Sequence, residues 1–214
     1  MSKVFFSVGM SLDGFIAPEG MELEHGDDPT YQDWGSQWGK LQAWIFQQQF
    51  FRANLKLGDG GETGADNRLL EETFNRTGVN IMGKRMFDGG ERYWPEEAPF
   101  HTPVFVVTHQ ARQPWERPGG TTFYFVNDGI ESALEQARAA ANGKDIRIAG
   151  GADIILQYLN AGLVDEFSIS LAPVFFGAGR RLFDGIDRRK VEVKIVEAIN
   201  SPLVTHLHYA VENT

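Results

Sequence analysis

Apolar residues along the chain fall into short runs separated by polar segments that contain glycine. Runs of β-branched and aromatic residues predict strands, and apolar positions three or four residues apart predict helices. The first run, residues 3–9, is apolar at nearly every position, which is typical of a strand buried on both faces. By the same criteria we expect strands at 79–82, 104–108, 121–126, 146–149, 167–171, 191–198 and 203–211, and helices at 36–53, 66–78, 130–141 and 152–160.

The order of these elements predicts the fold class. Strands and helices alternate as far as Gly162, and strands predominate after it. Alternation predicts a mixed, mostly parallel sheet flanked by helices on both faces. The last two strands, joined at residues 200–202, predict an antiparallel C-terminal hairpin. No linker divides the chain, so we expect one α/β domain over residues 1–214.

Composition excludes several classes of protein. The 214 residues are 42% hydrophobic and include 16 Phe, which is ample for a core and unlike a disordered chain. The absence of cysteine excludes disulfides, thiolate catalysis and cysteine-based metal sites. A net charge of −9 argues against a nucleic-acid partner. Since we find neither a signal-peptide pattern nor a membrane-length apolar segment, we expect a cytoplasmic protein with no membrane contact.

Groups suited to phosphate follow three of the expected strands. Gly150-Gly151-Ala152 leads from a strand into a helix, where glycine permits close backbone approach and helix N–H groups attract anions. Gly83 precedes a short helix that begins with Lys84 and Arg85, and Thr108-His109 ends another strand. Each is alternatively a plain turn or a solvated charge. Because ligands of open α/β sheets bind beyond the strand carboxyl ends, the coincidence of all three favours a phosphate-bearing ligand.

Three further patterns each have a structural and a functional interpretation. Trp38 and Trp44 either complete the core or line a cleft that stacks a flat heterocycle. His206 and His208 lie two apart on a strand and share one face, which would be half of a metal site. No third ligand is near them in sequence, so we expect no metal. The pair Phe175-Phe176 either fills the core or forms a homodimer interface.

Four segments resemble the dihydrofolate-reductase-like superfamily. They are residues 11–17, 82–87, 106–109 and 148–177, and they occur in the superfamily's order over nearly the whole chain. The resemblance is strongest to the bacterial group related to the reductase domain of the riboflavin-biosynthesis deaminase/reductase. It implies a three-layer dihydrofolate-reductase-like fold, NADPH as cofactor and hydride transfer to a C=N bond of a pteridine- or pyrimidine-like substrate.

The resemblance also implies roles for individual residues. The expected cofactor contacts are Ala17 at the nicotinamide, Gly83, Lys84 and Arg85 on the phosphates, Thr108 and His109 at the adenosine 2′-phosphate, and Gly150, Gly151, Ala152 and Asp153 around the pyrophosphate. The loop after Ala17, which we expect to be mobile and exposed over residues 18–33, would cover the nicotinamide. The candidates for substrate contact are Trp38, Trp44 and Met86.

The substrate half departs from the family pattern. In dihydrofolate reductases a carboxylate on the first helix serves the pterin, and the helix expected here at 38–51 contains no Asp or Glu. Reduction of a C=N bond also needs a proton, for which Asp13, Asp66 and Asp88 are candidates. Asp13 alternatively forms a turn and Asp66 alternatively caps a helix.

Three functions therefore stay open. The first is an NADPH-dependent reductase of a small heteroaromatic substrate. The second is the 5-amino-6-(5-phosphoribosylamino)uracil reductase of riboflavin biosynthesis, whose phosphoribosyl group would need Arg180 and Arg181, in a segment that we expect to be a flexible turn. The third is a non-catalytic protein that binds a nucleotide or another small ligand on the same fold.

Overall fold

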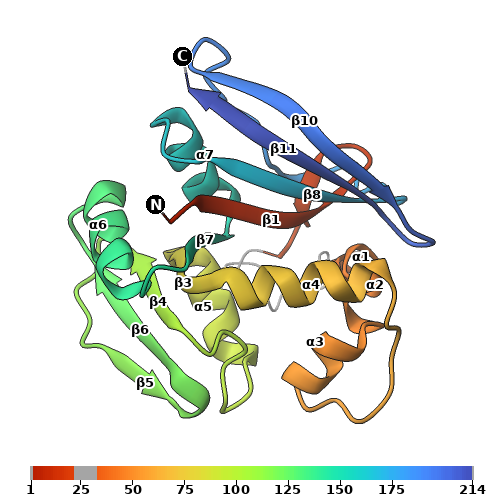
Figure 1. The fold of residues 1–214 in the computed structure, drawn as a ribbon, viewed down its shortest axis with the longest axis horizontal. Coiled ribbons are helices and arrows are strands. Elements are labelled where there is room, and N and C mark those ends of the chain that lie inside the picture. Colours follow the sequence, from red (N-terminus) through yellow and green to blue (C-terminus); the bar gives the residue numbers. More distant parts are fainter. Residues whose placement is uncertain (1, 22–32, 214) are drawn as a thin grey trace.

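A mixed sheet of nine strands crosses the part of the molecule that the computed structural model describes, residues 2–21 and 33–213 (Figure 1). The strand order is β10-β11-β8-β1-β7-β3-β4-β6-β5, and the six strands from β8 to β6 are parallel. The nine strands of the sheet are β1 (Val4–Ser11), β3 (Thr77–Gly83), β4 (Pro103–Val107), β5 (Trp115–Arg117), β6 (Thr121–Val126), β7 (Asp145–Gly150), β8 (Glu166–Ala172), β10 (Val191–Asn200) and β11 (Thr205–Asn213).

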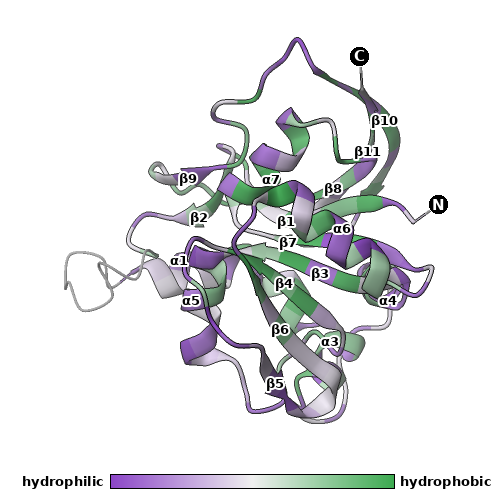
Figure 2. Cartoon of the chain, turned by 90° about the vertical axis from the view of Figure 1, so that its left-hand side faces the viewer, coloured by the Kyte–Doolittle hydropathy of each residue, from purple (hydrophilic) through white to green (hydrophobic). Residues whose placement is uncertain are grey.

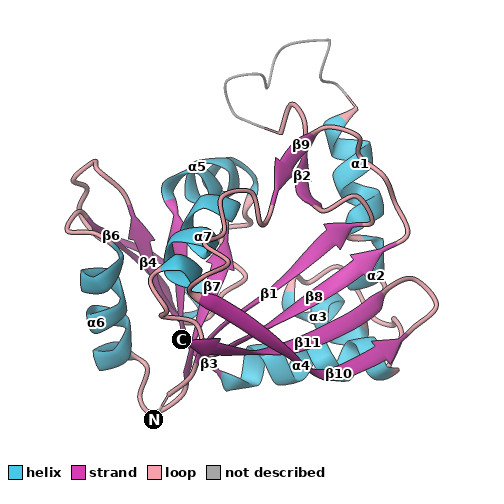
Figure 3. Cartoon of the chain, turned by 90° about the horizontal axis from the view of Figure 1, so that it is seen from above, coloured by secondary structure: helices cyan, strands magenta, loops and turns pink. Residues whose placement is uncertain are grey.

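Helices cover both faces, and a second, two-stranded sheet lies at one edge. The helices are α1 (Trp34–Leu41), α2 (Ala43–Phe46), α3 (Gln49–Asn54), α4 (Ala65–Arg76), α5 (Lys84–Tyr93), α6 (Ile130–Ala140), α7 (Ala152–Asn160) and the 3₁₀ turn η3 (Pro118–Gly120). The small sheet pairs β2 (Phe15–Pro18) with β9 (Gly179–Arg181), near α1 and the carboxyl ends of β1 and β8 (Figure 3). Within the described ranges, every helix is too short or too polar to cross a bilayer.

One face of the large sheet is apolar and is sealed by α6 and α7. Side chains that alternate along β1 and β7, such as Phe6 and Ile148, are fully buried there against Leu134 of α6 and Ile155 of α7. Burial of one such side chain stabilises the fold by about 1.5–3 kcal/mol. Figure 2 shows the corresponding concentration of hydrophobic residues along the central strands.

The opposite face is apolar beneath α5, where Met82, Val106 and Phe123 pack with Phe87, and polar beneath α4. Register partners on adjacent strands point to the same face of a sheet. Phe5 pairs with Arg147 and with Glu166, so these three residues, and every second residue from them along β1, β7 and β8, share one face. The polar residues that this register brings onto the α4 face are Ser7, Asn80, Arg147, Ser168, Ser170, His206 and His208. We call this surface the polar face.

The predicted α/β class, the mostly parallel sheet and the antiparallel C-terminal pair β10–β11 are confirmed. The single helix predicted at 36–53 is wrong, because that segment forms α1, α2 and α3. Gln48 has extended backbone angles, its side-chain amide donates to the Trp44 carbonyl at 2.7 Å, and residues 47–49 pair with Glu62. These bonds replace the helical ones and end the helix. Strands β2, β5 and β9 were not predicted, and residues 22–32 of the predicted mobile loop lie outside the described residues.

The two phenylalanines expected at a homodimer interface have different environments. Phe176 packs against the cluster that contains Leu41 and Trp44, whereas Phe175 is exposed. Phe176 therefore belongs to the core, and the homodimer stays a prediction.

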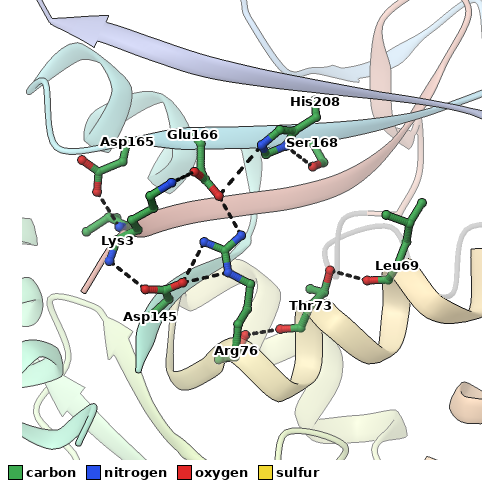
Figure 4. A network of polar contacts seen from close by, with 11 residues as sticks. Lys3, Leu69, Thr73, Arg76, Asp145, Asp165, Glu166, Ser168 and His208 are labelled. Carbon is green, nitrogen blue, oxygen red and sulfur yellow. Dashed lines mark hydrogen bonds and ion pairs between the residues drawn. The ribbon is translucent and has the colours of Figure 1, made fainter. Parts of the chain in front are cut away.

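A network of ions joins α4 to the amino-terminal ends of the strands (Figure 4). Arg76 donates to Asp145 at 2.8 Å and to Glu166 at 2.7 Å, and its guanidinium lies 4.2 Å from the centre of the Phe5 ring. Lys3 also pairs with Glu166. Burial alone would lower the pKa of Arg76 and raise that of Glu166, but the mutual hydrogen bonds prevail and shift both pKa values the other way. The network therefore stabilises the charged forms.

We expect Arg76→Met to lower the free energy of unfolding by about 3 kcal/mol, because it removes one of the two cations paired with the nearly buried Glu166 and also the guanidinium paired with Asp145. A carboxylate with a lowered folded pKa stabilises above its unfolded value, here 4.5, and loses that contribution as the pH falls through the folded pKa. The loss measured by urea unfolding should therefore be smaller below pH 4.5 than at pH 7. Lys56→Met, which removes an exposed ion pair, is the control; an equal loss in both variants contradicts the prediction.

Candidate functional site

The carboxyl ends of β3 and β7 lie side by side, and each strand leads directly into a helix. Gly150 is the register partner of Met82, next to Gly83. Gly83 is the N-cap of α5 and Gly151 that of α7. Since α7 packs on one face of the sheet and α5 on the other, two helix amino termini flank this edge from opposite sides. Their unpaired N–H groups make the edge attractive to anions.

Glycine is required at the end of β7. Gly150 has a φ of +135°, and the Gly150–Gly151 peptide bond is cis. A Cβ at Gly150 would lie 3.1 Å from the sulfur of Met86 in α5. The absence of a side chain therefore leaves bare backbone between the two helix starts, and Met86 lies at this junction rather than in a separate substrate pocket.

An acidic side chain links the predicted phosphate-binding residues across this edge. Asp153, in the first turn of α7, accepts a hydrogen bond from Arg85 of α5 at 3.1 Å and forms an ion pair with Arg180 of β9. All three side chains are about half exposed or more, so a ligand can reach them. Lys84 instead pairs with Asp88 within α5.

The small sheet brings the segment around Ala17 to the same place. Ala17 is the register partner of Arg180, and a Cβ at Gly179 would collide with the Ala17 carbonyl. Arg181 donates to the carbonyl of Asp13 at 2.8 Å and stacks on Phe15. The prediction of a flexible turn at 177–181 is therefore wrong for the last three residues, which are tied into a strand. A pocket of about 140 Å³ lies between this strand and the start of α7.

The end of β4 lies one strand beyond β3. Thr108 is buried, and its hydroxyl accepts a hydrogen bond from the backbone of Gln110 at 3.0 Å. Its carbonyl accepts from Asn127 at 3.1 Å. Thr108 thus forms the turn, while the neighbouring His109 is exposed and is the residue of the pair that a ligand can contact.

Asp13, a candidate proton donor, is part of a turn. Its carboxylate accepts hydrogen bonds from the Ser11 hydroxyl at 2.6 Å and from the backbone N–H groups of Phe176 and Gly177 at 3.2 and 2.7 Å. Burial would raise its pKa, but these bonds outweigh burial and lower the pKa. The carboxylate is thus held in its charged form and is a poor proton donor.

Asp66, the second candidate, lies on the polar face. It is buried in the first turn of α4, and its Oδ1 is 3.1 Å from Nε2 of His206. The other nitrogen of His206 is hydrogen-bonded to the Ser170 hydroxyl at 2.9 Å. The rings of Trp44 and His206 meet edge-on, with their centres 4.8 Å apart. The Nε1 of Trp44 is buried and has no hydrogen-bond partner. Gly64 is the N-cap of α4, so Asp66 does not cap the helix as the alternative interpretation held.

Both histidines have hydrogen-bonding partners within the protein. His208 bonds the Ser168 hydroxyl at 2.9 Å and lies 4.0 Å from Glu166. Each histidine thus lies between a serine and an acid, and the described residues contain no cluster of three or more metal-ligating side chains. Trp38, the other aromatic candidate, is half-buried against Phe46 and does not join this group.

Sequence analysis did not find Ser170, Arg147 or Arg180 as parts of one site. Ser168 and Ser170 alternate along β8 as His206 and His208 do along β11, and this period of two was the available signal. It predicts a shared face, but the pairing of the two strands and the arrival of α4 above them depend on tertiary contacts.

Comparison with known proteins adds relatives to this geometry. A family model described as the RibD C-terminal domain matches residues 2–205. The uncharacterized Bacillus subtilis protein YyaP is 40% identical over 128 residues, which are 57% of this chain and 67% of YyaP. The uncharacterized YwjB of the same organism is 29% identical over 86 residues, 40% of this chain and 48% of YwjB.

Solved structures share the fold at low identity. A protein assigned to riboflavin biosynthesis from Shewanella has a TM-score of 0.67 at 18% identity, with 100% of both chains covered. The deaminase/5-amino-6-(5-phosphoribosylamino)uracil reductase of Thermotoga maritima has 0.58 at 15%, covering 98% of this chain and 56% of that one. Enterococcus faecalis dihydrofolate reductase, solved with NADP(H), has 0.54 at 14%, covering 99% and 97%.

The structural neighbours confirm the dihydrofolate-reductase-like fold expected from the four sequence segments. The family match extends over nearly the whole chain and includes both glycine-led helix starts and the acid-linked arginines. The protein belongs to the RibD C-terminal domain family.

Proposed function

We propose that this protein is an NADPH-dependent reductase that transfers a hydride to a C=N bond of a small heteroaromatic, pteridine- or pyrimidine-like substrate. The observation that carries the proposal is that two sites lie toward the same edge of the parallel strands: the glycine-led starts of α5 and α7 follow β3 and β7, and Asp66 lies at the level of Gly9 and Ser170 near the ends of β1 and β8. The first suits the phosphates of a dinucleotide, and the second suits a polar substrate and its proton.

The residues at the strand ends fit the cofactor. Bare backbone at Gly150 leaves the room that a Cβ would fill, and the N–H groups of α5 and α7 point toward this edge. Arg85 and Arg180, held there by Asp153, would bind the pyrophosphate. NADPH supplies the hydride when bound, and the protein's part is to orient the reacting atoms and exclude water.

Asp66 is the best placed of the three candidate proton donors. Asp13 is held charged by its turn, and Asp88 is paired with Lys84. Asp66 lies on the substrate side of the sheet, at the level of Gly9 and Ser170, where β1 approaches its carboxyl end. A carboxyl group in hydrogen-bond reach of a substrate nitrogen can deliver the proton that reduction of C=N requires.

The two alternative functions have less support from the geometry. A phosphoribosyl group would need Arg180 and Arg181, but Arg180 is already assigned to the pyrophosphate of the cofactor, and Arg181 is hydrogen-bonded to the backbone of Asp13. No contact favours the aminouracil reductase over a reductase of another heterocycle. A non-catalytic ligand-binding role would preserve nucleotide binding without turnover, and the experiments below distinguish it.

The cofactor assignment predicts that substitutions at the pyrophosphate and at the 2′-phosphate change nucleotide affinity differently. Arg85→Ala should weaken NADPH and NADH binding alike by about tenfold, or about 1.4 kcal/mol, because the pyrophosphate is common to both. His109→Ala should weaken NADPH alone, because only NADPH carries the 2′-phosphate. Tryptophan-fluorescence titration measures both, with the exposed Arg138→Ala as control. Failure of the unmodified protein to bind either nucleotide would falsify the cofactor assignment.

The assignment of Asp66 as proton donor predicts that its replacement lowers turnover without weakening the binding of the cofactor. Asp66→Asn should lower kcat for NADPH oxidation by about 10²–10⁴-fold, the usual worth of general acid catalysis, and leave NADPH affinity unchanged. Steady-state assays with a panel of pterins and aminopyrimidines measure kcat. Glu72→Gln, which removes an exposed charge from the same helix, should retain full activity. Undiminished turnover in Asp66→Asn would rule Asp66 out, and NADPH binding without turnover on any substrate would favour the non-catalytic alternative.

A further inference from the structure

Two arginines lie in similar positions on the polar face but have different counterions. The Arg76 guanidinium is 4.2 Å from the centre of the Phe5 ring, and that of Arg147 is 5.5 Å from the centre of the Phe74 ring. Arg76 pairs with two carboxylates. Within the described residues, Arg147 has no carboxylate at ion-pair distance, so its positive charge is uncompensated.

The hydrogen bonds of Arg147 are also incomplete. Its Nη2 is 3.5 Å from the Ser7 carbonyl, at the limit of a hydrogen bond, and its buried Nε has no partner. The register partner Asn80 on β3 has a buried Oδ1 that is likewise without a partner. Burial lowers the pKa of Arg147 to about 10, which still leaves it a cation at neutral pH. Arg147 is only partly buried, so a ligand can reach it, but its Nε is buried without a hydrogen-bond partner. An unpaired buried donor costs free energy, and a ligand group that accepts from it removes that cost.

The direction of the side chain places this charge toward the reductase site. Arg147 is the register partner of Phe5, yet its guanidinium reaches the carbonyl of Ser7, two residues closer to the carboxyl edge. The next same-face row in that direction contains Ser170 and His206, which binds Asp66. An anion that enters the polar face from this edge would therefore approach the free Nε of Arg147.

We propose that Arg147 binds an oxyanion, a carboxylate or phosphate group of the ligand that occupies the polar face. The guanidinium presents planar N–H donors that match such a group, and the buried Nε gains the partner it lacks. That this ligand is the substrate rests on the proposed function, whereas the binding of an oxyanion at Arg147 does not.

The first test compares the two arginines in thermal unfolding without added oxyanions, in a chloride buffer. Arg147→Met removes an uncompensated charge and should leave Tm unchanged or raise it. Arg76→Met breaks a paired network and should lower Tm by about 5 °C or more. A fall in Tm for Arg147→Met as large as that for Arg76→Met overturns the proposal, because it would make Arg147 a structural cation.

The second test adds sodium phosphate or sodium acetate at constant ionic strength. The unmodified protein and Arg76→Met should gain Tm with increasing oxyanion, and Arg147→Met should not. A larger gain with phosphate than with acetate identifies a phosphate-bearing ligand, and the reverse identifies a carboxylate. An equal gain in Arg147→Met overturns the proposal.

A third measurement does not depend on the folding of any variant. Crystals of the unmodified protein soaked in selenate should show an anomalous selenium peak in contact with the Arg147 guanidinium, and absence of that peak overturns the proposal. None of these measurements uses a nicotinamide cofactor or turnover. The oxyanion proposal can therefore be confirmed even if the reductase assignment is wrong, and overturned even if that assignment is right.

Discussion

The parallel pairing of six strands determines where ligands meet this protein, because it brings their carboxyl ends to one edge. Strand alternation then separates the side chains: those that seal α6 and α7 onto the sheet are apolar, and the intervening ones gather beneath α4 as serines, histidines and an arginine. The starts of α5 and α7 and the polar groups beneath α4 consequently lie toward the same edge of the sheet. Under the function that we propose, the first region binds the cofactor and the second binds the substrate.

Charge at this edge is balanced inside the protein. Cations at a helix amino terminus are unfavourable, and α5 begins with Lys84 and Arg85. Asp88 and Asp153 pair with them, and Asp153 also holds Arg180 of the small sheet in place. Because these pairs are largely exposed, they contribute little to stability. Their effect is to hold the guanidinium groups of Arg85 and Arg180 close to one carboxylate, which under our proposal a pyrophosphate would replace.

The sequence predicted those parts of the fold and site that depend on local order. Apolar runs identified eight of the sheet strands, and glycine at strand ends located both helix starts, since each signal lies within a few residues. The helix at 36–53 was wrong because Glu62, a distant residue, pairs with the chain at Gln48. Sequence analysis named Asp66 as a candidate proton donor but did not predict its surroundings: Asp66 reaches the polar face through α4 and meets His206, 140 positions away. Such contacts depend on strand order, which periodicity does not encode.

Arg76 and Arg147 illustrate how one sheet face serves both stability and binding. At the amino-terminal end of the strands, buried charges are fully paired, and α4 is fastened to β7 and β8 by a closed network. Elsewhere on this face the polar groups are incompletely paired: Arg147 Nε and Asn80 Oδ1, which share a register row, and Trp44 Nε1 beside His206 are buried without partners. Unpaired buried groups lower stability, and selection tolerates that loss where a ligand restores the bonds. The closed network can offset this cost because α4 carries both Arg76 and Phe74, the aromatic residue over Arg147, so the pairing of Arg76 also holds α4 above the arginine that we propose binds an oxyanion.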